Sequence, residues 1–230
     1  DARVKLYVNE KNLGDYPNRN KAASYAKGKY LKYLDADDLI YPQGLEIMVH
    51  TMEQFPETAL GISQKVAEDV KPYPFVMKPK ETFTREFLMR GVLGLGPTGT
   101  IIRRDVFETL GGFTGTRYIG DTEMWYKIAL TYPVVKMEDA LVFWRQHDDQ
   151  EITKGQESFF YLENAFKLKL NTLQKKELPL GAPERQMALK KFTHRFSRNI
   201  ARLILKGHIV LANTIRKSCG ISWIKIIKAL

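Results

Sequence analysis

The chain has 230 residues, of which 44% are hydrophobic and 27% are charged, a composition typical of one large folded domain or of a domain with an appended helical segment. No run approaches the roughly 20 apolar residues of a membrane-spanning helix, so we do not expect an integral membrane protein. The single cysteine, Cys219, excludes an intramolecular disulfide and a zinc site built from cysteines, and it fits a reducing compartment.

The net charge of +10 is distributed unevenly along the chain. Residues 1–150 contain 20 Lys and Arg against 21 Asp and Glu, whereas residues 151–230 contain 16 against 5. The sequence therefore predicts two regions with different surfaces, a nearly neutral one over 1–150 and a basic one over 151–230.

Short β-like runs alternate with helical patterns over the first 150 residues, which predicts an α/β layer fold. In chain order we expect a strand at 4–8, a helix at 18–27, a strand at 29–34, a helix at 45–52, a strand at 60–66, a helix at 81–90, a glycine-rich loop at 91–99, a strand at 100–103, helices at 105–110 and 121–132, and strands at 134–137 and 141–145. Beyond these, only helices are expected, at 156–178, 184–206 and 208–217, before a short basic amphipathic end at 221–230.

The expected strand at 29–34 is almost continuously apolar, as in a strand buried on both faces, and it leads directly into Asp35-Ala36-Asp37-Asp38. Asp35 and Asp37 point the same way if this segment is extended, and they lie where open α/β sheets place their ligands. Clustered carboxylates repel one another, and a hard cation such as Mg²⁺ or Mn²⁺ removes that cost. The alternative is a solvated acidic turn with Asp38 as a helix cap.

An ordered series of short motifs runs through most of this region: Asn12–Gly14, Asn18–Ala22, Ala26–Leu31, Leu34–Asp38, Pro42, Arg103–Phe113, Gly120–Trp125 and Trp144–His147. The series resembles family 2 of the glycosyltransferases, which are inverting enzymes of the GT-A fold. The resemblance covers roughly residues 1–150 and implies a partial GT-A domain, because the first strands of the family's fold would have to precede Asp1.

The resemblance implies a role for each donor-side residue. Asp35 would contact the ribose or nucleotide, and Asp37 would hold the metal on the diphosphate. Arg19 is a candidate contact to the base or pyrophosphate, and His147 is a candidate closing contact on the diphosphate. Asp38 also matches the motif, without a defined role.

The same resemblance makes Asp121 the catalytic base. An aspartate before a helical run is also a favoured N-cap, and both roles can hold together. Gly120 stands where the family often has glutamate, which leaves Glu123 as the nearest second acid. Trp125 could stack on a sugar or belong to the core.

We therefore expect an enzyme that uses Mn²⁺ or Mg²⁺ to move a single sugar, with inversion, from a nucleotide-diphosphate sugar such as a UDP-sugar to a glycan or lipid-linked acceptor in envelope or surface-glycan synthesis. The Gln-x-x-Arg-Trp signature of processive synthases is absent, which favours single addition. Two alternatives remain: a non-catalytic scaffold whose tail binds a membrane surface or partner, and a nucleotidyltransferase.

The basic region at 151–230 has three interpretations. It can be a solvated helical cap, or it can lie on an anionic membrane leaflet, since Lys225 and Lys228 are interleaved with Trp223 and several aliphatic residues. Nucleic-acid binding ranks last, because no recognised motif or stacking platform is present. We expect a cytoplasmic protein, with peripheral contact at the inner face of the membrane under the second interpretation.

Overall fold

The computed structural model describes residues 1–64, 71–147 and 160–228. Its centre is a five-stranded sheet in the order β1-β5-β3-β6-β4. The strands are β1 (Tyr30–Leu31), β3 (Leu60–Ser63), β4 (Phe75–Met77), β5 (Thr100–Arg103) and β6 (Val134–Met137). Strands β3 and β6 are parallel, and the other pairs are antiparallel. A separate two-stranded ladder joins β2 (Leu39–Ile40) to β7 (Val142–Phe143).

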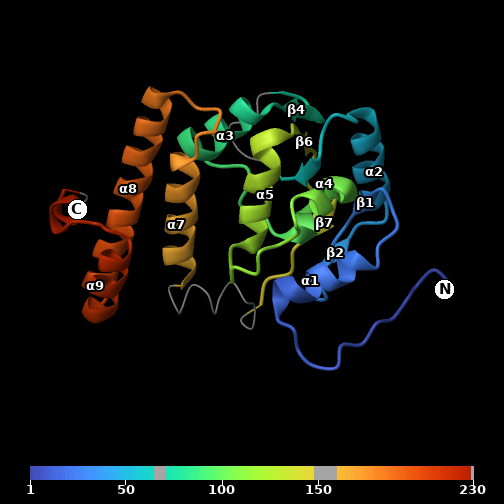
Figure 1. The fold of residues 1–230 in the computed structure, drawn as a ribbon, viewed down its shortest axis with the longest axis horizontal. Coiled ribbons are helices and arrows are strands. Elements are labelled where there is room, and N and C mark those ends of the chain that lie inside the picture. Colours follow the sequence, from blue (N-terminus) through green and yellow to red (C-terminus); the bar gives the residue numbers. More distant parts are fainter. Residues whose placement is uncertain (65–70, 148–159, 229–230) are drawn as a thin grey trace.

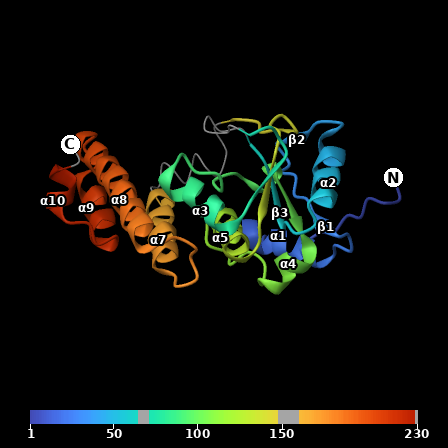
Figure 2. The same ribbon diagram turned by 90° about the horizontal axis from the view of Figure 1, so that it is seen from above.

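Helices surround this sheet and continue beyond it (Figures 1 and 2). The first group comprises α1 (Asp15–Ser24), α2 (Gly44–Gln54), α3 (Pro79–Leu88), the 3₁₀ turn η1 (Pro97–Gly99), α4 (Arg104–Thr109) and α5 (Gly120–Thr131). The second group comprises α7 (Phe160–Gln174), α8 (Ala182–Leu205), α9 (Ile209–Ser218) and α10 (Trp223–Ile227). The second group lies at one end of the molecule, opposite the N-terminus (Figure 1).

Successive side chains along each strand point to opposite faces of the sheet, so both faces can pack against helices. On one face, Ile101 and Val135 pack with Met48 and Met52 of α2. On the other face, the neighbouring residues of the same strands belong to the main core, which includes much of α3 and α5. Helices thus cover both faces of the sheet, so a functional site can form only at the loops that follow the ends of its strands.

Helices α7–α10 have a core of their own and also extend the main one. Phe166, Phe196, Ile200 and Ile215 belong to the second core, whereas Ala188, near the start of α8, belongs to the main core. The expected division at residue 150 falls outside the described residues and stays a prediction. None of the helices in the described ranges combines the length and apolar character needed to cross a bilayer.

Two details of the predicted strands are wrong. Residues 4–8 form no strand, and Val4, Leu6 and Val8 are more than 70% exposed. An alternating pattern makes a strand only where another strand pairs with it, and none of the described strands does. The strand at 29–34 is not buried on both faces either: β1 is shorter, it lies at the sheet's edge, and Leu34 is 50% exposed.

Candidate active site

The three carboxylates of the acidic turn after β1, those of Asp35, Asp37 and Asp38, have different surroundings. The backbone N–H of Asp38 donates to the carbonyl of Asp35 at 3.0 Å, which closes the turn. Asp38 is buried, and its Oδ1 accepts the backbone N–H of Arg145 at 3.1 Å. Asp35 and Asp37 stay partly exposed. Asp38 is not a helix cap, because α2 begins only at Gly44; it fastens the turn to the segment after β7.

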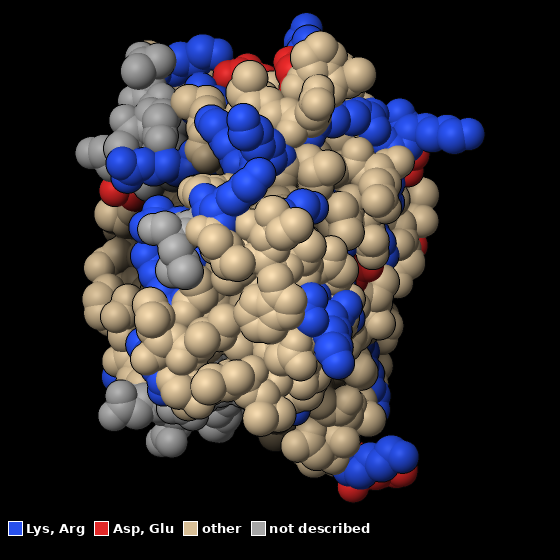
Figure 3. Space-filling view, turned by 90° about the vertical axis from the view of Figure 1, so that its left-hand side faces the viewer, with Lys and Arg blue, Asp and Glu red and all other residues tan. Residues whose placement is uncertain are grey.

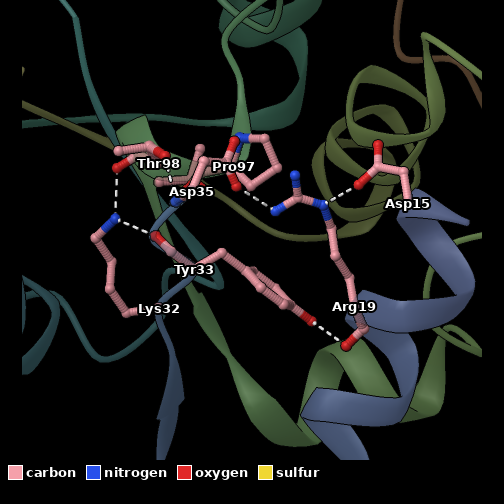
Figure 4. A network of polar contacts seen from close by, with 8 residues as sticks. Asp15, Arg19, Lys32, Tyr33, Asp35, Pro97 and Thr98 are labelled. Atoms are coloured by element: carbon pink, nitrogen blue, oxygen red, sulfur yellow. Dashed lines mark hydrogen bonds and ion pairs between the residues drawn. The ribbon is translucent and has the colours of Figure 1, made fainter. Parts of the chain in front are cut away.

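Arg19 of α1 joins two carboxylates (Figure 4). Its Nη1 lies 2.6 Å from Asp35 Oδ1, and its Nε lies 2.6 Å from Asp15 Oδ1. Burial acts to lower the pKa of Arg19, but the hydrogen bond and charge of Asp35, followed by those of Asp15, raise it overall. Tyr33 donates its hydroxyl to the Arg19 carbonyl at 3.2 Å, which ties α1 to the end of β1. The guanidinium therefore fixes the orientation of Asp35.

Lys32 lies beneath the same turn, and the sequence analysis did not identify it. Its Nζ donates to the carbonyls of Tyr33, at 2.7 Å, and of Thr98 in η1. The Thr98 hydroxyl in turn accepts the backbone N–H of Asp35 at 3.2 Å (Figure 4). Burial lowers the pKa of Lys32 to about 8, against the charges of Asp35 and Asp38. A lysine within an otherwise apolar run was the available signal for this contact.

Asp37 and His147 meet although 110 residues separate them: Nε2 lies 2.8 Å from Oδ2. Both side chains are partly exposed. A carboxylate oxygen and an imidazole nitrogen suit Mn²⁺, and Mg²⁺ is usually held by one or two carboxylates together with substrate phosphates. No group of three His, Cys, Asp or Glu that could hold a metal occurs within the described ranges. Asp37 and His147 thus offer two ligand atoms for such a metal, fewer than a complete protein site would supply.

Asp121 is the second residue of α5 and not its N-cap, which is Ile119. Its Oδ1 accepts the backbone N–H of Thr122 at 2.6 Å. Burial raises the pKa of Asp121 to about 6; the charge of Asp15 also raises it, and that of Arg19 lowers it. Asp121 is thus within electrostatic reach of the Arg19 cluster, which contacts Asp35 directly.

Steric contact explains why the residue before Asp121 is glycine. A Cβ on Gly120 would lie 2.7 Å from Tyr16 Cε2, closer than side chains approach each other. Tyr16 is buried, and its pKa is raised by that burial and then by the charge of Asp121. A glutamate at position 120 would have to displace this ring. Glu123, the nearest second acid, instead accepts hydrogen bonds from the hydroxyls of Thr114 and Thr116 and so holds their loop.

Two aromatic residues, Trp125 and Tyr161, bear on the interpretation of Asp121. Trp125 is fully buried, and its Nε1 donates to the Leu95 carbonyl at 2.9 Å, so its place is in the core. Tyr161 of α7 was not predicted: its pKa is raised by burial and then by the charge of Asp121. The basic helical region therefore contributes a side chain close to the candidate base.

Comparison with known sequences identifies a family over the first half of the chain. Residues 1–111 match the model for glycosyl transferase family 2. An uncharacterized glycosyltransferase of Methanocaldococcus jannaschii is 35% identical over 38% of this chain and 33% of its own. The Escherichia coli UDP-Glc:alpha-D-GlcNAc-diphosphoundecaprenol beta-1,3-glucosyltransferase WfgD is 38% identical over 23% of this chain and 21% of its own. The chain thus spans only a third or less of these two relatives.

Solved structures with low sequence identity share the fold. A mannosyltransferase from Pyrobaculum calidifontis, in complex with GDP-Man and Mn²⁺, aligns over 96% of this chain and 66% of its own, with a TM-score of 0.56 and 15% identity. S. aureus TarS 1–349, in complex with UDP-GlcNAc, aligns over 95% and 76%, with a TM-score of 0.54 and 14% identity. These matches confirm the predicted fold class, including the helices after the sheet.

Proposed function

Because residues 1–111 belong to glycosyltransferase family 2 and the fold is of the GT-A type, we propose that this chain transfers a single sugar from a nucleotide-diphosphate sugar to an acceptor hydroxyl, with inversion. The observation that supports it most directly is that α1 reaches both residues: Arg19 contacts Asp35, and the ring of Tyr16 lies against Gly120, next to Asp121. The residue expected at the donor and the residue expected at the acceptor thus lie near the same helix.

On the donor side, Asp35 contacts the ribose or nucleotide, and Arg19 holds its carboxylate in place. Asp38 acts through the backbone of Arg145, since this contact ties the acidic turn to the segment that carries His147. Lys32 keeps positive charge close beneath the turn and limits the repulsion among its carboxylates. UDP-sugars are the proposed donors, in line with the name of the Escherichia coli relative.

Asp37 and His147 would hold Mn²⁺ or Mg²⁺. When bound, such a metal neutralises the charge that grows on the leaving diphosphate. His147 Nε2 lies 2.8 Å from Asp37 Oδ2, so the two side chains are held next to each other at the acidic turn. His147 is also close enough to Asp37 to reach the same diphosphate.

Asp121 is the general base. With a pKa of about 6 it is ionised at neutral pH, yet it is basic enough to accept the proton of an incoming hydroxyl. The N–H of Thr122 fixes Oδ1, so Oδ2 takes the proton. One carboxylate on the face opposite the leaving diphosphate is sufficient for inversion.

The acceptor is a glycan or lipid-linked hydroxyl in envelope or surface-glycan synthesis. The name of the Escherichia coli relative includes a diphosphoundecaprenol acceptor, which supports this class. Donor choice depends on loops such as 91–99, which Trp125 fastens to α5.

The test measures Mn²⁺-dependent binding of UDP- and GDP-sugars by thermal shift, and release of nucleoside diphosphate with a panel of acceptors. We expect Asp121→Asn to retain donor binding and to lose about 10²–10⁴-fold in kcat. Asp37→Ala should lose the metal-dependent part of donor binding.

Glu123→Gln is the matched control, because it makes the same chemical change two residues further along α5. Equal losses in Glu123→Gln and Asp121→Asn, or full activity in Asp121→Asn, would contradict the assignment of the base. Failure of every nucleotide sugar to bind would contradict the proposed function itself.

A further inference from the structure

One face of α8 carries a row of cations. Lys191, Arg195, Arg198 and Arg202 follow one another at i, i+4, i+7 and i+11, which places them in a single stripe along the helix, and all four are exposed. The chain contains no Asp or Glu after Glu184. The row therefore lies beyond Glu184, the acid in the first turn of α8, and no acidic residue follows it on α8, α9 or α10.

The protein itself does not balance the charge of this row. Like charges three and four residues apart destabilise a helix. Within the described ranges no ion pair includes any of the four; Lys191 donates to the Leu88 carbonyl at 3.0 Å, and Arg202 contacts the Asn199 amide at 3.4 Å. Figure 3 shows Lys and Arg spread over this end of the molecule, with Asp and Glu mainly near its rim. An anion outside the protein would relieve the repulsion.

The row ends at an exposed apolar turn between α8 and α9. Leu205, Ile209 and Val210 are 77%, 60% and 83% exposed, and Gly207, with a φ of +85°, reverses the chain between them. Aliphatic side chains this exposed are costly in water when they are clustered. Cations and aliphatic residues thus adjoin on one surface, which is typical of helices that lie in a membrane interface.

The α8–α9 turn, where the row ends, lies on the same side of the molecule as the first turn of α5. In Figure 1 the last turn of α8 and the first turns of α5 and α7 all lie toward the lower side of the molecule. Those first turns carry Asp121 and Tyr161. A flat partner held by the α8–α9 turn would therefore extend along the side of the molecule on which α7 and α5 begin.

We propose that the α8–α9 surface, defined by Lys191, Arg195, Arg198, Arg202, Leu205, Ile209 and Val210, docks onto an anionic phospholipid leaflet. The cations contact lipid phosphates, and the three aliphatic side chains enter the boundary between headgroups and acyl chains. Nucleic acid fits less well, because its bases are held by aromatic stacking and exposed aliphatic residues add nothing to phosphate binding. The inference concerns a surface outside the transfer site and does not depend on the proposed activity.

The test is co-sedimentation of the full chain with vesicles of phosphatidylcholine alone or mixed with phosphatidylglycerol, at low and at high salt. We expect binding only to the mixed vesicles, weakened by salt. Replacing the four cations of α8 by glutamine should weaken binding by at least ~100-fold. Replacing Leu205, Ile209 and Val210 by serine should weaken it more at high salt, where the apolar term dominates.

The matched control replaces four exposed lysines elsewhere, Lys5, Lys11, Lys21 and Lys27, by glutamine, which changes the net charge equally. Circular dichroism checks that all variants are folded, and Asp121→Asn should bind vesicles as the parent does. The proposal is overturned if the control loses as much binding as the α8 variant, if phosphatidylcholine alone binds equally, or if the chain binds single-stranded RNA but not mixed vesicles.

Discussion

Lysine and arginine side chains around the sheet have different partners from those along α8–α10. Around the sheet, cations lie against carboxylates: Arg19 contacts Asp15 and Asp35, and Lys29 contacts Glu53. Along α8–α10, none of the exposed Lys and Arg residues of the described segment contacts an acid, and no Asp or Glu follows residue 184 in the sequence. The net charge of +10 is thus the property of one region.

Cations with and without an internal partner can serve different functions. A cation held between two carboxylates fixes their direction, which a reaction centre needs. A cation without an internal partner remains available to an external anion, and its attraction acts at a distance. The same residue types therefore predict a reaction centre in one region and a docking surface in the other, and removal of a cation should have opposite effects on stability in the two regions.

The largest expected effect is at Glu86, where the two regions meet. This carboxylate is 6% exposed; it accepts the N–H groups of Val92 and Leu93 at 2.9 and 3.0 Å, and Lys169 of α7 lies 3.5 Å away. Glu86→Ala leaves these donors without a partner and should lower the free energy of unfolding by about 3–5 kcal/mol in urea denaturation. Glu108→Ala, which breaks an exposed pair with Arg104, should cost at most about 1 kcal/mol; equal costs would contradict this interpretation.

Much of the fold could be predicted from local patterns. The strands at 100–103 and 134–137 lie as expected, because each is a short apolar run with clear ends. Helix α1 begins three residues earlier than predicted, at Asp15, directly after Gly14 with its φ of +80°. These differences concern ends of elements, which local sequence specifies weakly.

The contacts of the candidate site could be predicted only in part. The acidic turn, Asp121 and His147 were recognised as residues, but the contact between Asp37 and His147 spans 110 positions and depends on how two loops fold together. Nothing near Asp38 in the sequence indicates that it faces inward to Arg145. The positions of Tyr16 and Tyr161 near Asp121 likewise follow from helix packing and not from spacing.

The next effect in size is at Arg19, whose side chain is 18% exposed. Arg19→Met leaves Asp15 and Asp35 without their cation and should lower the free energy of unfolding by about 2 kcal/mol. It should also raise the pKa of Asp121 further, because Arg19 lowers it in the parent, and so move the rising limb of the pH–rate profile to higher pH. Lys29→Met, which breaks an exposed pair, should change neither quantity comparably; a profile that stays in place in Arg19→Met would contradict the coupling.

A smaller effect of opposite sign is expected for Asp121→Asn. Burial raises the pKa of Asp121 from 3.8 to about 6, so the folded state disfavours the charged form, and stability is lost as the pH rises through 6. At pH 8 the variant should be more stable by about 1–2 kcal/mol, after allowing for partial exposure of the side chain. The gain should vanish well below the unfolded-state pKa of 3.8, where the carboxyl is protonated in both states; a variant less stable than the parent at pH 8 in urea denaturation would contradict this.

The smallest effect should come from the four cations of α8. Replacing Lys191, Arg195, Arg198 and Arg202 by glutamine removes two like-charge pairs at i, i+4 and one at i, i+3, each worth about 0.2–0.5 kcal/mol. The free energy of unfolding should therefore rise by about 1 kcal/mol at low salt, and the difference should shrink as salt screens the charges. A loss of stability in thermal or urea denaturation would mean that the row has internal partners. A gain would show that these cations are kept at a cost to the fold, as expected of residues that serve a contact outside it.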